Sequence, residues 1–248
     1  MTLNMTVSPD FSPDKLAGWF VLNTWLQRRL DTAIHLEMHD TFDRLRRAVA
    51  EGRVDLIYAN PADAAMLVRK NGFIAVAQPL NVADEAIVIV NAASPARCVE
   101  DLKPGIRVAS TADPDIDMMG MIMLEPADLS ADNVTVEILG NHTLVAKALI
   151  NGKADVGILP ARAYDSLSNM VRASLRPLVR SEISVVRHVL LAGQKAAGLV
   201  PALADLLVGM AGDEKGGAIL RDLGFLGWEK CSQEDVEFMI DLVDTLMA

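Results

Sequence analysis

The chain has 248 residues, a formal net charge of −10 and a pI near 4.8. Its Lys and Arg residues are scattered and offer no basic face to a phosphate backbone, which excludes nucleic acid as a partner. Hydrophobic residues make up 51% of the chain and the mean hydropathy is +0.26, so we expect a large core and not a disordered chain.

The first residues, MTLNMTV, lack the charged, apolar and small-residue regions of a secretory leader. No apolar run is expected to be long enough to span a bilayer, so we predict no membrane insertion and, for the chain as written, a cytoplasmic location. A mature chain whose leader has been removed would look the same.

The first third of the chain alternates strands and helices. Residues 3–7 are predicted as a strand, followed by a turn-rich loop that contains Ser8 and Phe11. The elements that follow are a helix at 13–30 with Ser12 as N-cap, a strand at 34–38, a helix capped by Thr41, a strand at 56–59, a helix opened by Pro61, and a strand at 73–77. This order predicts an α/β fold with a parallel sheet and right-handed crossovers.

After residue 79 the alternation breaks, because an extended run at 85–91 follows with no helix between. We interpret this run as a crossing into a second lobe. Strands are then predicted at 106–110, 134–139, 156–159 and 175–181, a returning extended run at 183–192, and helices at 199–210, 214–223 and 233–246. The predicted domains are therefore a discontinuous lobe one, residues 1–83 and 191–248, and a lobe two, residues 84–190, joined by two extended crossings.

A repeated pattern relates the two predicted lobes. Residues 45–64 (LRRAVAEGRVDLIYANPADA) and 145–164 (VAKALINGKADVGILPARAY) match at a spacing of one hundred residues, with Gly52 answering Gly152 and Asp55 answering Asp155. Each copy predicts an amphipathic helix, a left-handed Gly that ends it, a cation and a buried strand. Because such strands end at the carboxyl edge of a sheet, residues 58–60 and 158–160 are predicted to line a cleft.

Candidate ligand contacts lie at these predicted edges. Tyr58 and Asn60 end a strand and suit hydrogen bonding to a small polar molecule, although Asn60 before Pro61 can equally be a helix cap. His142 begins a helix between Asn141 and Thr143, where any of the three can donate to a ligand; the alternative is a cap with His142 in solvent.

A third group of candidates precedes and enters the helix at residues 118–124. Asp115 and Asp117 can select a cation, an amine or a neutral ligand, or can simply cap the helix. Met118 belongs to a methionine cluster that suits copper(I), but methionines at helical spacing more often line a core or pocket. We therefore expect no metal site and no cofactor.

Sequence motifs of catalysis are missing, since there is no nucleophile elbow, no Gly-rich phosphate loop and no placed carboxylate pair, and we predict no catalytic residue. The two cysteines, Cys98 and Cys231, match no zinc pattern, and whether they pair is left open.

Four segments carry a resemblance to a known family: VSPDFSPDKLAGWF (7–20), AVAEGRVDLIYANPADAAML (48–67), LGNHTLVAKALINGKADVGIL (139–159) and AILRDLGFLGWEKCSQED (218–235). In this order they resemble the PhnD-like phosphate, phosphite and phosphonate-binding group of type II periplasmic solute-binding proteins. The resemblance implies two lobes, each a mainly parallel sheet flanked by helices, which close on a small oxyanion. It also implies a periplasmic location and, as partner, either an ABC permease or a histidine-kinase sensor.

The expected ligand contacts also include Ser8 and Phe11 in the loop after the first predicted strand, Glu85 at the start of the first crossing, and Leu159 at the end of the strand in the second repeat. The family's Ser-Thr-Ser-Gly-like anion loop is replaced here by the acidic stretch DPDIDMMG at 113–120, which speaks against ordinary phosphonate binding. Two alternatives remain at this point: a cytosolic enzyme on the same fold, and an interaction module that has lost its ligand.

Overall fold

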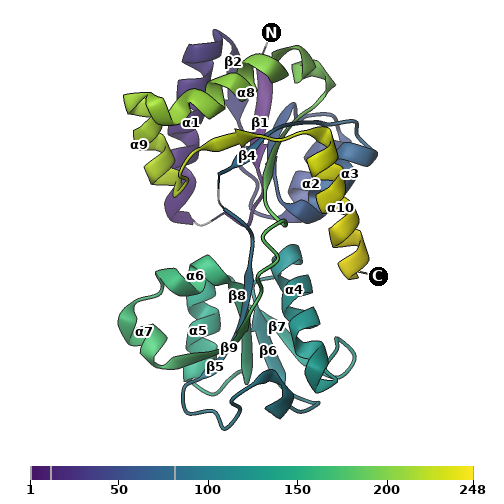
Figure 1. The fold of residues 1–248 in the computed structure, drawn as a ribbon, viewed down its shortest axis with the longest axis vertical. Helices are drawn as coiled ribbons and strands as arrows, with labels where there is room; N and C mark the ends of the chain where they lie inside the picture. The colour runs from purple at the N-terminus through teal and green to yellow at the C-terminus, as the bar shows by residue number, and fades with distance from the viewer. Residues whose placement is uncertain (1, 12, 81, 248) are drawn as a thin grey trace. The chain divides into compact units, whose positions relative to one another are not determined.

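In a computed structural model, which describes residues 2–11, 13–80 and 82–247, the chain forms two compact units (Figure 1). The first unit comprises the residues up to Val82 together with Arg187–Val243. The second comprises Ala83–Val186 together with the residues from Asp244 onward.

The first unit is built on a six-stranded sheet of order β11-β4-β10-β3-β1-β2. Its elements are β1 (Thr2–Val7), α1 (Leu16–Leu30, after a 3-10 turn at Pro13–Lys15), β2 (Ala33–Leu36), α2 (Phe42–Ala50), β3 (Leu56–Ala59), α3 (Pro61–Arg69), β4 (Ile74–Pro79), β10 (Val189–Ala192), a 3-10 helix at Gln194–Leu199, α8 (Val200–Val208), a 3-10 turn at Gly209–Gly212, α9 (Glu214–Leu223), β11 (Trp228–Lys230) and most of α10 (Gln233–Met247).

This sheet is mixed, whereas the strand and helix order predicted a parallel one. Strands β1, β2 and β3 are parallel, but β10 returns antiparallel between β3 and β4, and β11 adds an antiparallel edge beside β4. Only Val189–Ala192 of the predicted run 183–192 is a strand, and β11 was not predicted. The expected N-cap Ser12 lies outside the described residues.

The second unit holds a five-stranded sheet of order β7-β6-β8-β5-β9. Its elements are β5 (Ala86–Asn91), a 3-10 turn at Val99–Asp101, β6 (Arg107–Ser110), α4 (Pro114–Leu124), a 3-10 turn at Glu125–Ala127, β7 (Thr135–Ile138), α5 (His142–Ile150), β8 (Val156–Pro160), α6 (Ala161–Ser166), α7 (Asn169–Ala173) and β9 (Leu175–Arg180). Strands β6, β7 and β8 are parallel, and β5 is antiparallel to β8 and β9. The predicted α/β class is confirmed, with two mixed sheets flanked by helices.

The repeat seen in the sequence forms the same local structure in both units. Gly52 and Gly152 end α2 and α5 with φ of 68° and 65°, so the predicted left-handed glycines are confirmed. The equivalent aspartates then accept a backbone N–H from a neighbouring strand: Asp55 Oδ2 lies 2.7 Å from the N of Asn4, and Asp155 Oδ2 lies 2.9 Å from the N of Arg107. In each copy the aspartate therefore joins the start of its buried strand to the neighbouring strand by a hydrogen bond.

The stretch Gln194–Gly212 is, by length and composition alone, apolar enough to cross a membrane, with a mean hydropathy of 1.4 over its window. This is contrary to our expectation that no apolar run of the chain is long enough to span a bilayer. In the fold the stretch is divided into α8 and two 3-10 segments, and Leu203, Leu207 and Met210 pack in the core of the first unit. The apolar character of the stretch is thus used, at least in part, by this core.

Candidate functional site

The carboxyl edge of the first sheet is formed where β1 and β3 end together. Val7 pairs with Tyr58, the N–H of Ser8 donates to the carbonyl of Tyr58 (2.9 Å), and the N–H of Asn60 donates to Ser8 Oγ (3.0 Å). Ser8 and Asn60 are both fully buried. Ser8 thus fastens two strand ends to each other, and Asn60 caps α3 by accepting from the N–H of Asp63 (2.9 Å).

An aromatic cluster surrounds Tyr58 at this edge. Its ring centroid lies 4.8 Å from that of Trp19, 5.1 Å from that of His188, which stacks on it, and 5.9 Å from those of Phe225 and Trp228. Tyr58 is only 5% exposed. The space around its ring is therefore filled by the protein's own side chains.

Beside the cluster lies a buried pair that the sequence did not single out. Nε2 of His188 lies 3.1 Å from Oδ1 of Asp10, and both side chains are at most 9% exposed. Among the described residues, neither Oδ2 of Asp10 nor Nδ2 of Asn60 has a hydrogen-bond partner, although both atoms are buried. This edge therefore offers one acceptor and one donor with unused hydrogen-bonding capacity. Phe11, in the same loop, packs against the core and is partly exposed.

A second buried carboxylate lies on α3. Burial raises the pKa of Asp63, and the hydrogen bond and positive charge of Arg46 oppose this rise. Nε of Arg46 donates to Oδ1 of Asp63 at 2.7 Å. Buried charge is therefore partly neutralised by an arginine from α2.

The carboxyl edge of the second sheet is dominated by three aspartates at the start of α4. Asp113 is the N-cap, and its Oδ1 accepts from the N–H of Ile116 at 3.3 Å. The hydroxyl of Ser110, the last residue of β6, donates to Asp117. Asp115 is 2% exposed. Burial raises the pKa of Asp117, and the Ser110 hydroxyl opposes this rise.

These contacts use the groups that a helix N-terminus normally offers to an anion. The first-turn N–H of Ile116 is bonded to the protein's own carboxylate, and the Ser110 hydroxyl is bonded to another. Ala112, just before the helix, has a φ of 59°, in the left-handed region that a non-glycine residue rarely adopts. The helix start is therefore built around carboxylates in place of hydroxyls.

The helix α5 begins at the same edge. Asn141 is its N-cap, accepting from the N–H of Leu144 at 3.0 Å, and Thr143 is exposed. His142 is partly buried, and burial followed by the positive charge of Arg162 lowers its pKa. A neutral imidazole is favoured at this position.

The remaining sequence candidates of the second unit occupy different surroundings. Leu159 is fully buried in the core between the sheet and α5. Glu85 bonds the chain that leaves β9: it accepts from the Ser181 hydroxyl and from the N–H groups of Ile183 (3.1 Å) and Ser184 (2.7 Å). Met118 is partly exposed on α4, next to a buried Met119.

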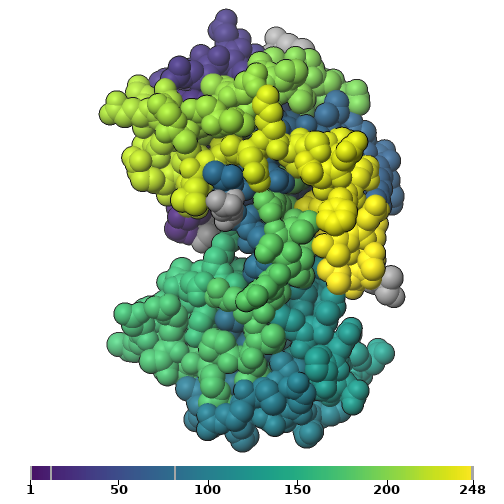
Figure 2. Space-filling view, viewed as in Figure 1, coloured from purple at the N-terminus to yellow at the C-terminus, as the bar shows by residue number. Residues whose placement is uncertain are grey.

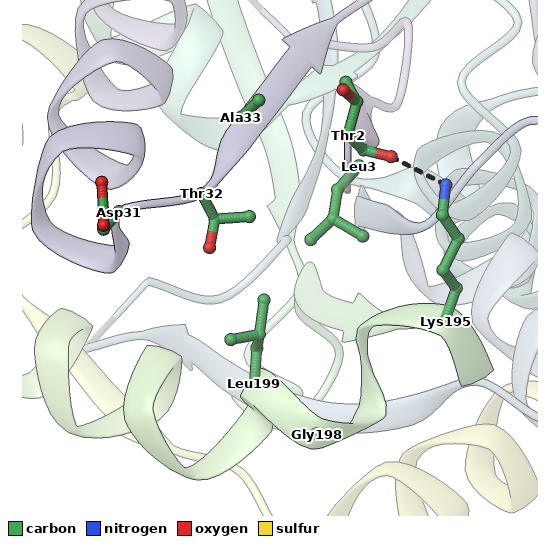
Figure 3. A pocket seen from close by; sticks show the side chains of 8 residues that line it. All are labelled: Thr2, Leu3, Asp31, Thr32, Ala33, Lys195, Gly198 and Leu199. Atoms are coloured by element: carbon green, nitrogen blue, oxygen red, sulfur yellow. Dashed lines mark hydrogen bonds between the residues drawn. The ribbon is translucent and has the colours of Figure 1, made fainter.

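A separate hollow of about 490 Å³ lies at the opposite, amino edge of the first sheet (Figure 3). Lys195 reaches into it and donates to the carbonyl of Thr2 (2.8 Å) and to Asp55 Oδ2 (2.9 Å). The cation is thus committed to structural bonds. Since ligands of α/β sheets bind at the carboxyl edge, we do not assign function to this hollow.

Comparison with known proteins points to one family. A family described as "ABC transporter, phosphonate, periplasmic substrate-binding protein" matches residues 5–236. No curated protein sequence matches the chain.

Solved structures share the fold. PhnD1 from Prochlorococcus marinus (MIT 9301), in complex with methylphosphonate, superposes with a TM-score of 0.83 at 14% identity, covering 99% of this chain and 98% of that one. XAC2383 from Xanthomonas citri, bound to ATP, gives a TM-score of 0.80 at 17% identity with coverage of 99% and 98%. The aliphatic sulphonate binding protein SsuA from Escherichia coli gives 0.66 at 14% identity, with coverage of 99% and 91%. At these identities the structures establish the two-lobed fold alone.

Proposed function

We propose that this chain, which belongs to the family of periplasmic substrate-binding proteins of phosphonate ABC transporters, binds a small solute that is cationic or neutral in place of a phosphonate. The family makes it a solute-binding protein of the ABC-transporter type, and we infer an ABC permease as its partner. We further propose that the carboxyl edges of the two sheets close on one solute.

The acidic start of α4 carries the ligand argument. Asp113, Asp115 and Asp117 stand within its first turn and at its cap, and a phosphonate dianion bound there would meet like charge. At about 5 Å and an effective dielectric constant of about 20, one carboxylate repels a dianion by roughly 7 kcal/mol. The helix dipole returns about 0.3–2 kcal/mol. The repulsion between the carboxylate and the dianion therefore exceeds the attraction that the helix dipole provides.

The edge of the first sheet supports the same ligand class. Asp10 carries a buried carboxylate oxygen without a partner among the described residues, which suits an ammonium, amidinium or hydroxyl donor. Nδ2 of Asn60 is a buried donor in the same situation and suits a carbonyl or hydroxyl oxygen of the solute. A solute that carries both a donor and an acceptor, such as a hydroxyl group or an amine beside a carbonyl, satisfies both atoms.

Thermal shift and calorimetry with a panel of pure solutes test the proposal. We expect amines, polyamines, betaines or polyols to include a ligand that stabilises the protein by about 2.7 kcal/mol at one hundred times its Kd, and methylphosphonate, phosphate and sulphonates to give no shift. Tight binding of methylphosphonate, with no response to any cationic or neutral solute, would overturn the ligand class.

Three variants connect the ligand to the residues. Asp10→Asn and Asp117→Asn should each weaken binding of a cationic solute by about tenfold or more. Asp40→Asn is the matched control, because Asp40 is exposed and forms a surface ion pair with Arg44 (3.0 Å). Equal affinities in all three variants would remove both carboxylates from the site.

A further inference from the structure

Helices α1 and α9 pack against each other at the two ends of their contact and leave a groove between. At one end Gly18 lets α9 approach closely, because a Cβ there would lie 2.9 Å from Cδ2 of Leu223. At the other end Trp25 Nε1 donates to the N-cap Asp213 (3.3 Å), which also pairs with Arg29. The helices therefore run antiparallel. Figure 1 shows α9 beside α1 within the first unit.

The groove has a volume of about 730 Å³, with apolar residues along its middle and charged residues at its two ends. Trp25 and Ile219 form buried parts of its lining, and Phe20 and Val21 stand on the α1 side, 47% and 48% exposed. Leu16, also on α1, is 40% exposed. Residues 16–27 of α1 carry no charged side chain, so the helix is apolar toward solvent as well as toward the core.

Charges on this face are divided between its two ends. Among the residues that line the groove, the cations Arg28, Arg29 and Lys215 lie at the end near Asp213, and the single anion, Asp222, lies at the end near Gly18. Asp14, which precedes α1 at that same end, is 66% exposed and pairs with Lys15 (3.2 Å between Oδ2 and Nζ). A face with one cationic and one acidic end is complementary to itself after a two-fold rotation.

We propose that this face binds a second copy of the chain, with the two α1 helices antiparallel across a two-fold axis near Phe20. In this arrangement Phe20 of each copy enters the groove of the other. Arg28 approaches Asp14 of the second copy, and the helix dipoles oppose each other favourably. A protein of net charge −10 gains from such local pairing, which brings opposite charges together against its general self-repulsion.

The size of the face sets the expected strength. Helix α1 has 15 residues and is therefore about 22 Å long. Helix α9 has 10 residues and is about 15 Å long, so at about 10–12 Å of width per helix the two present a footprint of about 400 Å², below the roughly 800 Å² per partner of a standard stable interface. We therefore expect a weak dimer with a Kd of about 10–100 µM.

In the space-filling view α8 and α9, in yellow-green, cover much of the visible face of the first unit, and α1, in purple, appears at its margins (Figure 2).

Sedimentation equilibrium of the full chain, from about 1 to 300 µM, measures this dimer. We expect self-association that Phe20→Glu weakens at least about tenfold. Phe238→Glu is the matched control, since Phe238 is a 63% exposed phenylalanine on α10, and it should leave the Kd unchanged. A monomer at every concentration, or a dimer indifferent to Phe20→Glu, would overturn the proposal.

A charge exchange tests the orientation of the helices. Asp14→Arg and Arg28→Asp should each weaken the dimer, and the double variant should restore it, because the two charges meet across the axis. Both positions are exposed, so folding is expected to persist and is verified by circular dichroism. If the Kd of the double variant's dimer is raised by as much as the two single effects combined, the antiparallel pairing is refuted.

Discussion

Removal of the repeated aspartate should cost the two units different amounts of stability, although the two positions match in sequence. Asp55 is 5% exposed, and its Oδ2 accepts from the N–H of Asn4 (2.7 Å) and from Lys195 Nζ (2.9 Å). Asp155 makes three bonds to Arg107, but its side chain is 42% exposed and water can replace them.

The magnitudes follow from this difference in burial. The bond from the N–H of Asn4 to Asp55 contributes about 1.5–3 kcal/mol, and the ion pair with Lys195, whose side chain is 43% exposed, adds about 0.2–1 kcal/mol, so Asp55→Ala should lower the free energy of unfolding by about 2–4 kcal/mol. The exposed ion pair of Asp155 contributes about 0.2–1 kcal/mol, and with its backbone bond Asp155→Ala should cost about 1–2 kcal/mol. Asp55→Asn keeps an acceptor for Asn4 and should lie between the two.

Hydrogen exchange read peptide by peptide is the suitable assay, because two units need not unfold as one cooperative transition. Asp55→Ala should lower protection in β1 and β3, and Asp155→Ala should lower protection more weakly in β6 and β8. Equal losses in the two variants, or a loss from Asp55→Ala that appears in the second unit, would show that burial of the bonds does not set their contribution.

Three further outcomes are expected. Gly120→Ala should cost about 1–3 kcal/mol in denaturant unfolding, because its Cβ would lie 2.4 Å from Cγ2 of Ile158. Burial raises the pKa of Asp117 above its ordinary value of 3.8. The contribution of Asp117 to the free energy of unfolding therefore falls as the pH rises from 3.8 through the folded-state pKa. Asp117→Asn should stabilise the protein at pH 7, and urea unfolding should show no such gain well below pH 3.8. A thiol reagent at neutral pH should label the exposed Cys98 well before Cys231 in the folded protein. The hydrogen bond with Glu100 raises the pKa of Cys98 as well, but burial raises the pKa of Cys231 to about 12 and shields its sulfur; equal labelling rates would contradict the fold around β11.

Local signals in the sequence predicted most of the elements. Thr41 caps α2 by accepting from the N–H of Arg44, and the two repeat glycines adopt the left-handed conformation, because caps and glycines act within a few residues. The antiparallel positions of β10 and β11 were not predicted. Strand periodicity reports which face of a strand is buried and says nothing about its neighbour or direction.

In the candidate site, too, local sequence signals predict some residues and do not reveal contacts between distant parts of the chain. Tyr58 and Asn60 were placed at a sheet edge because a strand-ending position can be read from the repeat. The pair of Asp10 and His188 was missed because its members are 178 residues apart and no local pattern connects them. The loop that contains Asp10, directly after the first predicted strand, was the available signal. Leu159, chosen as a strand-end residue, points into the core because alternate residues of a strand face opposite sides.

The insertion of β10 between β3 and β4 has a consequence for how the protein is made. A ribosome releases residues 83–186, which hold the whole five-stranded sheet of the second unit, as one continuous stretch, so this sheet can form while the chain is still growing. The sheet of the first unit lacks a central strand until Val189–Ala192 has emerged. Strands β1, β2 and β3 can pair before then, but β4 has no strand beside it that links it to β3, so β3 presents an unpaired edge to other chains during this interval.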